Sequence, residues 1–203
     1  MIDRNSFSVF NDPTLPGRLK KIQTDVDPDF ETMGQNLIDL LHPQLDQKMY
    51  LHVAKHLRRH KNPPVDTWFA LSASPRGYKM LPHFEVGIWP DTLFITFACL
   101  SEMTNREVVV DWLTQQDWQI IPAFQISTDH TSAASEVYSQ ATWEKAVDRY
   151  RNVQKSDFLL GTWIKRDDSR FAQPKLIEQL IYNQVIDLAP VYQEVVGALK
   201  AEK

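Results

Sequence analysis

The segment from Lys48 to His83 gathers the side chains of this chain that are best suited to chemistry. It holds four of the six histidines and seven lysines and arginines against one acid, Asp66, so its net charge is +6 while that of the whole chain is −4. A local reversal of charge this sharp usually marks a surface for an anionic partner. Imidazoles set among cations can also exchange protons near neutral pH.

Three histidines of this segment, His52, His56 and His60, are spaced by four residues. This spacing predicts a helix from about Leu45 to Lys61, on which the three rings would form one stripe. The sequence Asn62-Pro63-Pro64 would end the helix, because a residue that precedes proline disfavours helical dihedral angles.

The expected helix favours an anion over a metal ion. Two histidines one turn apart can bind zinc, but Val53 stands where a zinc protease would carry glutamate, and Lys55 and Arg59 would repel a dication. We therefore predict no metal site. Lys55, Arg59 and a histidine would instead surround a phosphate or carboxylate with charged donors, and the cations would lower the histidine pKa values. The alternative is a solvated basic face whose aliphatic stems pack on the sheet.

A β-hairpin is expected to follow, with strands His83 to Trp89 and Thr92 to Leu100. Pairing around Pro90-Asp91 would place one apolar face in the core. The expected pairs on that face are Ile88 with Leu93, Val86 with Ile95, and Phe84 with Phe97.

The opposite face of the hairpin supplies candidates for proton transfer. His83 and Glu85 point the same way and, with His56, are our catalytic candidates. Together with Thr96 they would form the floor of a pocket, in which Gly87 leaves room for a ligand. Alternatively, the face is half-solvated or covered by a helix, and Glu85 simply pairs with Arg76 or Lys79. The turn Arg76-Gly77-Tyr78-Lys79 could stack a base or hold a phosphate, or be no more than an exposed turn. The candidate ligand-binding residues are His52, Lys55, Arg59, Arg76, Tyr78 and Lys79.

The remaining sequence reads as one α+β domain over residues 1–203, with a largely antiparallel sheet flanked by helices. Two amphipathic helices open it, with Asp27-Pro28 as a boundary, and a C-terminal helical region follows that Pro190 could interrupt. Further strands are expected at Thr67 to Ser72, Gln119 to Ser127 and Phe158 to Lys165, and further helices at Thr142 to Gln154 and after a capping box at Thr104 to Glu107.

Composition sets the broad class. The chain has 203 residues, 43% of them hydrophobic, with no run of about 20 apolar residues and no signal-like start. Its one cysteine, Cys99, lies in an apolar run and should be a buried structural thiol. We therefore expect a cytoplasmic protein with no membrane partner. Nucleotide-hydrolysis loops, dinucleotide fingerprints, serine-hydrolase elbows and zinc-finger spacings are absent from the sequence.

The segment HVAKHLRRHKNPPVDTW, followed by RGYKMLPHFEVGIW, resembles the YktB-like family of uncharacterised bacterial proteins. The resemblance extends over nearly the whole chain. It implies a compact α+β domain distantly like the catalytic domain shared by biotin ligases and class II synthetases, and it brings no established activity or cofactor. The residues that fall on its motif are His52, Lys55, His56, Arg58, Arg59, Arg76, Tyr78, Lys79 and His83. His60 lies outside it, which weakens a three-histidine metal site.

Three functional hypotheses remain. The leading one is a small anionic ligand, a nucleotide or phosphorylated metabolite, held by Lys55, Arg59 and Arg76 where the basic helix meets the hairpin. The alternative is a non-enzymatic nucleic-acid or protein-interaction module that uses the same basic patch. In the third, the basic segment of one copy meets the acidic remainder of a second copy. Residue spacing leaves the ligand, any reaction and the oligomeric state open.

Overall fold

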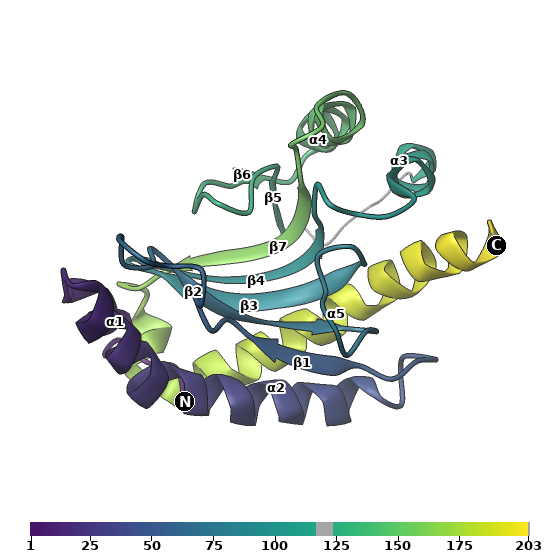
Figure 1. The fold of residues 1–203 in the computed structure, drawn as a ribbon. Helices are drawn as coiled ribbons and strands as arrows, with labels where there is room; N and C mark the ends of the chain where they lie inside the picture. Colours follow the sequence, from purple (N-terminus) through teal and green to yellow (C-terminus); the bar gives the residue numbers. More distant parts are fainter. Residues whose placement is uncertain (117–123, 203) are drawn as a thin grey trace.

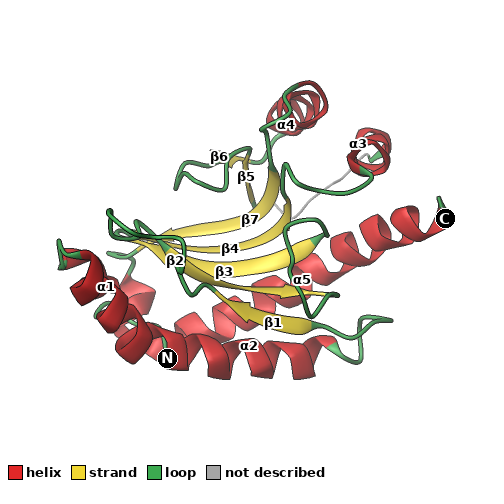
Figure 2. Ribbon diagram, in the orientation of Figure 1, coloured by secondary structure: helices red, strands yellow, loops and turns green. Residues whose placement is uncertain are grey.

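The computed structural model of this protein describes residues 1–116 and 124–202, and an antiparallel sheet dominates its fold (Figures 1 and 2). The sheet has seven strands in the order β1-β2-β3-β4-β7-β5-β6. Its strands are β1 (Tyr50–Val53), β2 (Thr67–Ser72), β3 (His83–Trp89), β4 (Thr92–Cys99), β5 (Gln125–Ser127), β6 (Glu136–Val137) and β7 (Phe158–Lys165). The α-helices of the described residues are α1 (Leu15–Lys21), α2 (Asp27–Leu41), α3 (Arg106–Gln115), α4 (Gln140–Asn152) and α5 (Pro174–Ala201).

Helices α2 and α5 pack against the sheet and against one another, and Figure 1 shows both running beneath it. The alternating apolar residues of β3, which are Phe84, Val86 and Ile88, point into this core and are fully buried. They pair with Phe97, Ile95 and Leu93 of β4, as the sequence predicts. The expected class, one α+β domain with an antiparallel sheet and flanking helices, is confirmed.

The predicted helix from Leu45 to Lys61 is wrong. Residues 50–53 form the edge strand β1, and residues 54–66 form an extended loop that leads into β2. Leu51 and Val53 lie beside core residues of β2, and Leu51 packs against α2 where Gly34 leaves it room. Burial of these apolar side chains and pairing with β2 outweigh the helical spacing of the histidines.

Both prolines that were expected to divide helices are accommodated. Asp27-Pro28 does begin α2, but a π-helical turn, Ile22–Val26, joins it directly to α1. Helix α5 runs through Pro190, whose side chain is exposed. The expected break there is wrong, because packing against the sheet on the buried side holds the helix together.

Other boundaries agree in part with the sequence. Strand β7 has the predicted limits, and Cys99 is fully buried as expected. Helix α3 starts at Arg106 after a left-handed Asn105 whose side chain makes no capping hydrogen bond, so the predicted capping box is wrong. Most of the predicted strand Gln119 to Ser127 lies outside the described residues, and its described part contains β5.

No helix in the described ranges is both long enough and apolar enough to cross a membrane.

Candidate functional site

A cavity of about 790 Å³ opens between the loop that follows β1 and the turn that precedes β3. We call it the basic cavity. All six residues that the sequence nominated for ligand binding line it, and so does the catalytic candidate His56. These residues are His52, Lys55, His56, Arg59, Arg76, Tyr78 and Lys79. The strand β1 and the loop after it take the place of the predicted helix, and the turn before β3 supplies the other residues, as the sequence suggested.

Four of the cavity's cations form no direct ion pair with a described residue. In the described part of the chain, the exposed side chains of these four form no ion pair and no hydrogen bond: they are Lys55, Arg58, Arg59 and Arg76. Lys79 differs, since its Nζ lies 3.6 Å from a carboxylate oxygen of Glu102. Four cations without a direct ion pair that line one hollow are available to an anion.

His56 is held in an unusual backbone conformation inside this cavity. Its φ of 49° is left-handed, which is costly for a residue with a Cβ atom. The ring Nε2 lies 3.1 Å from Thr67 Oγ1, and the ring packs edge-on against Trp68 at 5.6 Å. Burial, helped by the positive charge of Arg59, lowers the His56 pKa to about 4, so the ring is neutral at pH 7.

This strained backbone gives a direct prediction for stability. We expect the His56→Gly variant to be more stable than His56→Ala by about 1 kcal/mol, because only glycine adopts positive φ freely. Both variants lose the same ring contacts, so their difference isolates the backbone. Urea unfolding measures it. A more stable alanine variant would mean that residue 56 is not left-handed.

His52 and Tyr78 complete one aromatic side of the cavity. His52 Nε2 lies 2.8 Å from the carbonyl oxygen of Ser74, which can only accept, so this nitrogen carries the proton. Trp68 Nε1 donates a hydrogen bond to the Tyr78 hydroxyl at 2.9 Å. Burial raises the pKa of Tyr78 far above its usual value, so the phenol stays neutral. This side therefore offers aromatic surface with little charge.

The other two catalytic candidates lie behind this surface. The Tyr78 ring contacts that of His83 at 4.9 Å, and His83 and Glu85 are 0% and 4% exposed. His83 Nδ1 donates to the carbonyl oxygen of Leu81 at 2.7 Å, and Nε2 lies 3.2 Å from Glu85 Oε1. Since Nδ1 must carry a proton, the Nε2 contact holds a second proton between imidazole and carboxylate.

One part of the expected pocket floor is present and another is wrong: His83 and Glu85 contact one another as the sequence suggested. Glu85 pairs with His83, so its alternative pairing with Arg76 or Lys79 is wrong. The space beside Gly87 is filled, since an added Cβ atom would lie 2.5 Å from side-chain atoms of both Phe94 and Trp68. The glycine therefore serves packing, and the expected room for a ligand is not there. Thr96 does lie beside Glu85, with a buried hydroxyl that has no hydrogen-bond partner among the described residues.

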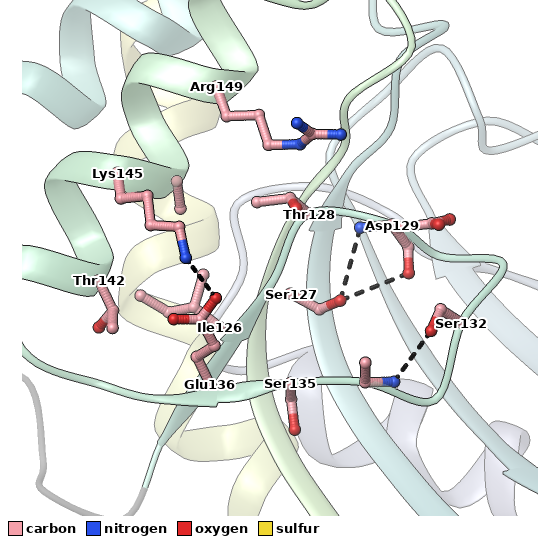
Figure 3. A pocket seen from close by; sticks show the side chains of 12 residues that line it. Ile126, Ser127, Thr128, Asp129, Ser132, Ser135, Glu136, Thr142, Lys145 and Arg149 are labelled. Carbon is pink, nitrogen blue, oxygen red and sulfur yellow. Dashed lines mark hydrogen bonds and ion pairs between the residues drawn. The ribbon is translucent and has the colours of Figure 1, made fainter.

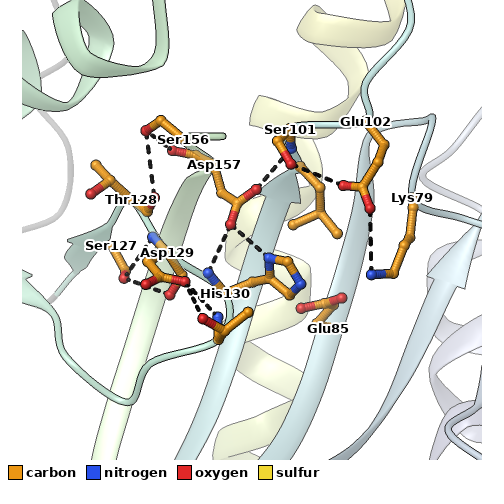
Figure 4. A network of polar contacts seen from close by, with 12 residues as sticks. Lys79, Glu85, Ser101, Glu102, Ser127, Thr128, Asp129, His130, Ser156 and Asp157 are labelled. Atoms are coloured by element: carbon orange, nitrogen blue, oxygen red, sulfur yellow. Dashed lines mark hydrogen bonds and ion pairs between the residues drawn. The ribbon is translucent and has the colours of Figure 1, made fainter. Parts of the chain in front are cut away.

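A second polar group, which the sequence analysis missed, lies beside Glu85 (Figure 4). The Asp157 carboxylate is 2% exposed and accepts hydrogen bonds from the backbone N–H of Ser101 and from both the backbone N–H and the Nδ1 of His130, the last at 2.6 Å. No hydrogen bond of His130 Nε2 is found in residues 1–116 and 124–202. An imidazole oriented in this way by a buried carboxylate is suited to proton transfer through its free nitrogen.

The pKa values of this pair move apart. Burial lowers the pKa of His130, but hydrogen bonding to Asp157 and the charge of that group outweigh burial and raise it. Burial likewise raises the pKa of Asp157, and the contacts with His130 outweigh it, so the net change is a decrease. Each charged form therefore stabilises the other.

We expect Asp157→Asn to destabilise the protein more at pH 5 than at pH 9. The stabilisation from His130 is complete below pH 6.5, the pKa of His130 in the unfolded chain. This stabilisation is lost as the pH rises through the higher pKa that His130 has in the folded protein. The stabilisation from Asp157 is present above pH 3.8, the pKa of its carboxyl group in the unfolded chain. It is lost as the pH falls through the lower pKa that Asp157 has in the folded protein. Unfolding measured at both pH values checks this. The exposed Asp111→Asn serves as control, and an equal loss at both pH values would contradict the ion pair.

Asp157 and His130 also belong, with Asp129, to a group whose ligand atoms lie within 4.8 Å of one another. The Asp157 oxygens already accept three N–H hydrogen bonds, so protein contacts alone account for this arrangement. Beside it lies a second cavity of about 320 Å³, which Asp129 and Lys145 help to line (Figure 3). Lys145 is neutralised there by Glu136 at 2.7 Å, which leaves Arg149 as the one described cation of this lining without an ion pair, so this cavity is less suited to an anion than the basic cavity.

Asp66 is a further residue whose importance the sequence did not show. Burial raises its pKa to about 6, against the opposing charge of Arg59 and with a contribution from Glu85. It therefore changes charge near neutral pH close to the cavity's cations. In the sequence it appeared only as the single acid of a basic segment. Neither its burial nor the meeting of His130 with Asp157 has a signal in local spacing.

Comparison with known proteins places the chain among sequences of undetermined role. Residues 3–192 match the family model described as a domain of unknown function, DUF1054. A UPF0637 protein of Latilactobacillus sakei is 38% identical over 95% of this chain and 98% of its own length. Another, of Lactiplantibacillus plantarum, is 36% identical over 100% and 99%, and one of Oceanobacillus iheyensis is 35% identical over 92% of each chain. The expected membership of an uncharacterised bacterial family is confirmed, and the chain belongs to the DUF1054 family.

Proposed function

We propose that the protein binds, in the cytoplasm, a small anionic ligand such as a nucleotide or a phosphorylated metabolite. One observation supports this most strongly: Lys55, Arg59 and Arg76 come from two loops to line one cavity, and none forms an ion pair among the described residues. Cations without partners bind phosphate or carboxylate oxygens through charge-assisted hydrogen bonds. The volume of about 790 Å³ also falls in the usual range of small-molecule sites.

Chemistry on the bound ligand would depend first on His56. It lines the cavity and is neutral at pH 7, so it can accept a proton, although a pKa of about 4 makes it a weak base. His83 and Glu85 share a proton behind Tyr78, where they could adjust the charge of the site without touching the ligand. Their assignment as proton-transfer groups stays a prediction.

Thermal unfolding against a panel of nucleotides, phosphorylated metabolites, inorganic phosphate and short oligonucleotides tests the proposal. A ligand at 100 times its Kd adds about 2.7 kcal/mol, which should raise the Tm by roughly 5 to 10 °C. A small anion that gives this shift supports the proposal. If no small anion of the panel raised the Tm, the proposal would be contradicted.

A second candidate is an interaction module for nucleic acid. The loop after His56 carries Arg58, Arg59, His60 and Lys61 in succession, all exposed, so the positive charge extends beyond the cavity. Such a module would bind long polyanions with a steep dependence on salt concentration. It would respond little to mononucleotides, which separates it from the leading proposal.

A further inference from the structure

Two large apolar side chains of the basic cavity are unusually exposed. Leu57 is 81% exposed and Met80 is 57% exposed, and both line the cavity beside its cations. They come from different loops, since Leu57 follows His56 and Met80 follows Lys79. Exposed apolar side chains gathered at a hollow usually mark a surface that another molecule covers.

The backbone holds both side chains in these positions. The carbonyl oxygen of Met80 accepts hydrogen bonds from the backbone N–H of Thr104 at 3.1 Å and from its hydroxyl at 2.8 Å. Leu57 lies within a turn closed by the bond from Arg59 N–H to the His56 carbonyl oxygen at 3.0 Å. These hydrogen bonds hold the backbone that carries the two exposed side chains.

Apolar and charged groups occur together on both loops. Lys55 and Arg59 lie on either side of Leu57 in the first loop, and Lys79 directly precedes Met80 in the second. A ligand that touched the cations alone would leave the two apolar groups in water. A ligand with a charged end and an apolar end would satisfy both kinds of surface.

We infer that the basic cavity takes an amphipathic anion, with a phosphate-type head on the cations and an apolar group over Leu57 and Met80. The inference rests on the proposed function and narrows its ligand class. Either an aromatic base or an aliphatic chain supplies the apolar group. The aromatic surface of Trp68 and Tyr78 in the same cavity is compatible with both.

Three phosphate monoesters that share one head group test the inference by isothermal titration calorimetry. Ribose 5-phosphate lacks an apolar group, AMP adds an aromatic base, and octyl phosphate carries an aliphatic chain. We expect AMP or octyl phosphate to bind at least tenfold more tightly than ribose 5-phosphate, since an apolar side chain is covered only in those complexes. Whichever binds more tightly identifies the kind of apolar group.

Variants separate this inference from the proposed function. Leu57→Ser and Met80→Ser should remove the tenfold advantage and leave the affinity for ribose 5-phosphate unchanged, while Lys55→Ala should weaken all three ligands. Leu176→Ser, at a leucine that is 43% exposed in α5, is the matched control and should change none of the affinities. Equal binding of the three esters would overturn the inference alone. If none of the three esters bound, and no small anion raised the Tm in the thermal-unfolding panel, the proposed function would be overturned as well.

Discussion

The Arg59→Ala variant should bind the best phosphate ligand of the panel about tenfold more weakly, and the double variant with Arg76→Ala about a hundredfold more weakly. A hydrogen bond to a charged group contributes about 1.5 to 3 kcal/mol, and the two arginines come from separate loops, so their effects should add. Both side chains are exposed and unpaired, so the fold should survive their loss. Calorimetric titration measures the affinities, and the unfolding midpoint reports on the fold.

A matched pair of lysines provides the control for charge. Lys55 lines the basic cavity, whereas Lys155 is an exposed lysine that does not. Lys55→Ala should weaken phosphate binding, and Lys155→Ala, which changes the net charge equally, should not. If both variants lose affinity alike, the binding reflects overall charge and the cavity is not its site.

The Gly161→Ala variant should lose about 3 kcal/mol or more of its free energy of unfolding. Gly161 lies in β7 between β4 and β5, where an added Cβ atom would lie 2.8 Å from Thr96 Cα and closer still to the carbonyl oxygen of Ile95. These neighbours are backbone atoms of a paired central strand, which cannot move aside without breaking ladder hydrogen bonds. Urea unfolding provides the measurement.

Gly197 is the control for this substitution. It is exposed in the last two turns of α5, and an added Cβ atom would meet nothing within 4 Å. Gly197→Ala should therefore stabilise the protein by about 0.5 to 1 kcal/mol, because alanine favours the helix. If the two glycine variants had similar effects, the close approach of β7 to β4 would be contradicted.

The centre of the sheet could be predicted because its sequence pattern and its environment agree. Phe84, Val86 and Ile88 alternate with other residues, and that alternation gives both the strand and the face that it buries. The hairpin register follows, since a slip by one residue would turn these side chains out of the core.

The region around the candidate site could not be predicted in the same way. The histidine spacing that suggests a helix lies in a strand and a loop, whose shape depends on contacts with α2 and β2. Composition picked out the cations and the turn that line the basic cavity, while their meeting depends on tertiary structure. The pairing of His130 with Asp157 arises only because the loop after β5 lies beside the start of β7. The distant likeness to biotin ligases and class II synthetases stays a prediction.

The most direct test of ligand binding in the basic cavity follows tryptophan indole signals in ¹⁵N NMR spectra during titration with the best small anion. The Trp68 indole N–H lies in the cavity and donates to Tyr78, whereas that of Trp143 is buried and donates to the carbonyl oxygen of Leu113. We predict that the Trp68 signal shifts and saturates with the binding curve while the Trp143 signal stays in place. A ligand that raises the Tm but leaves the Trp68 signal unmoved would contradict binding in this cavity.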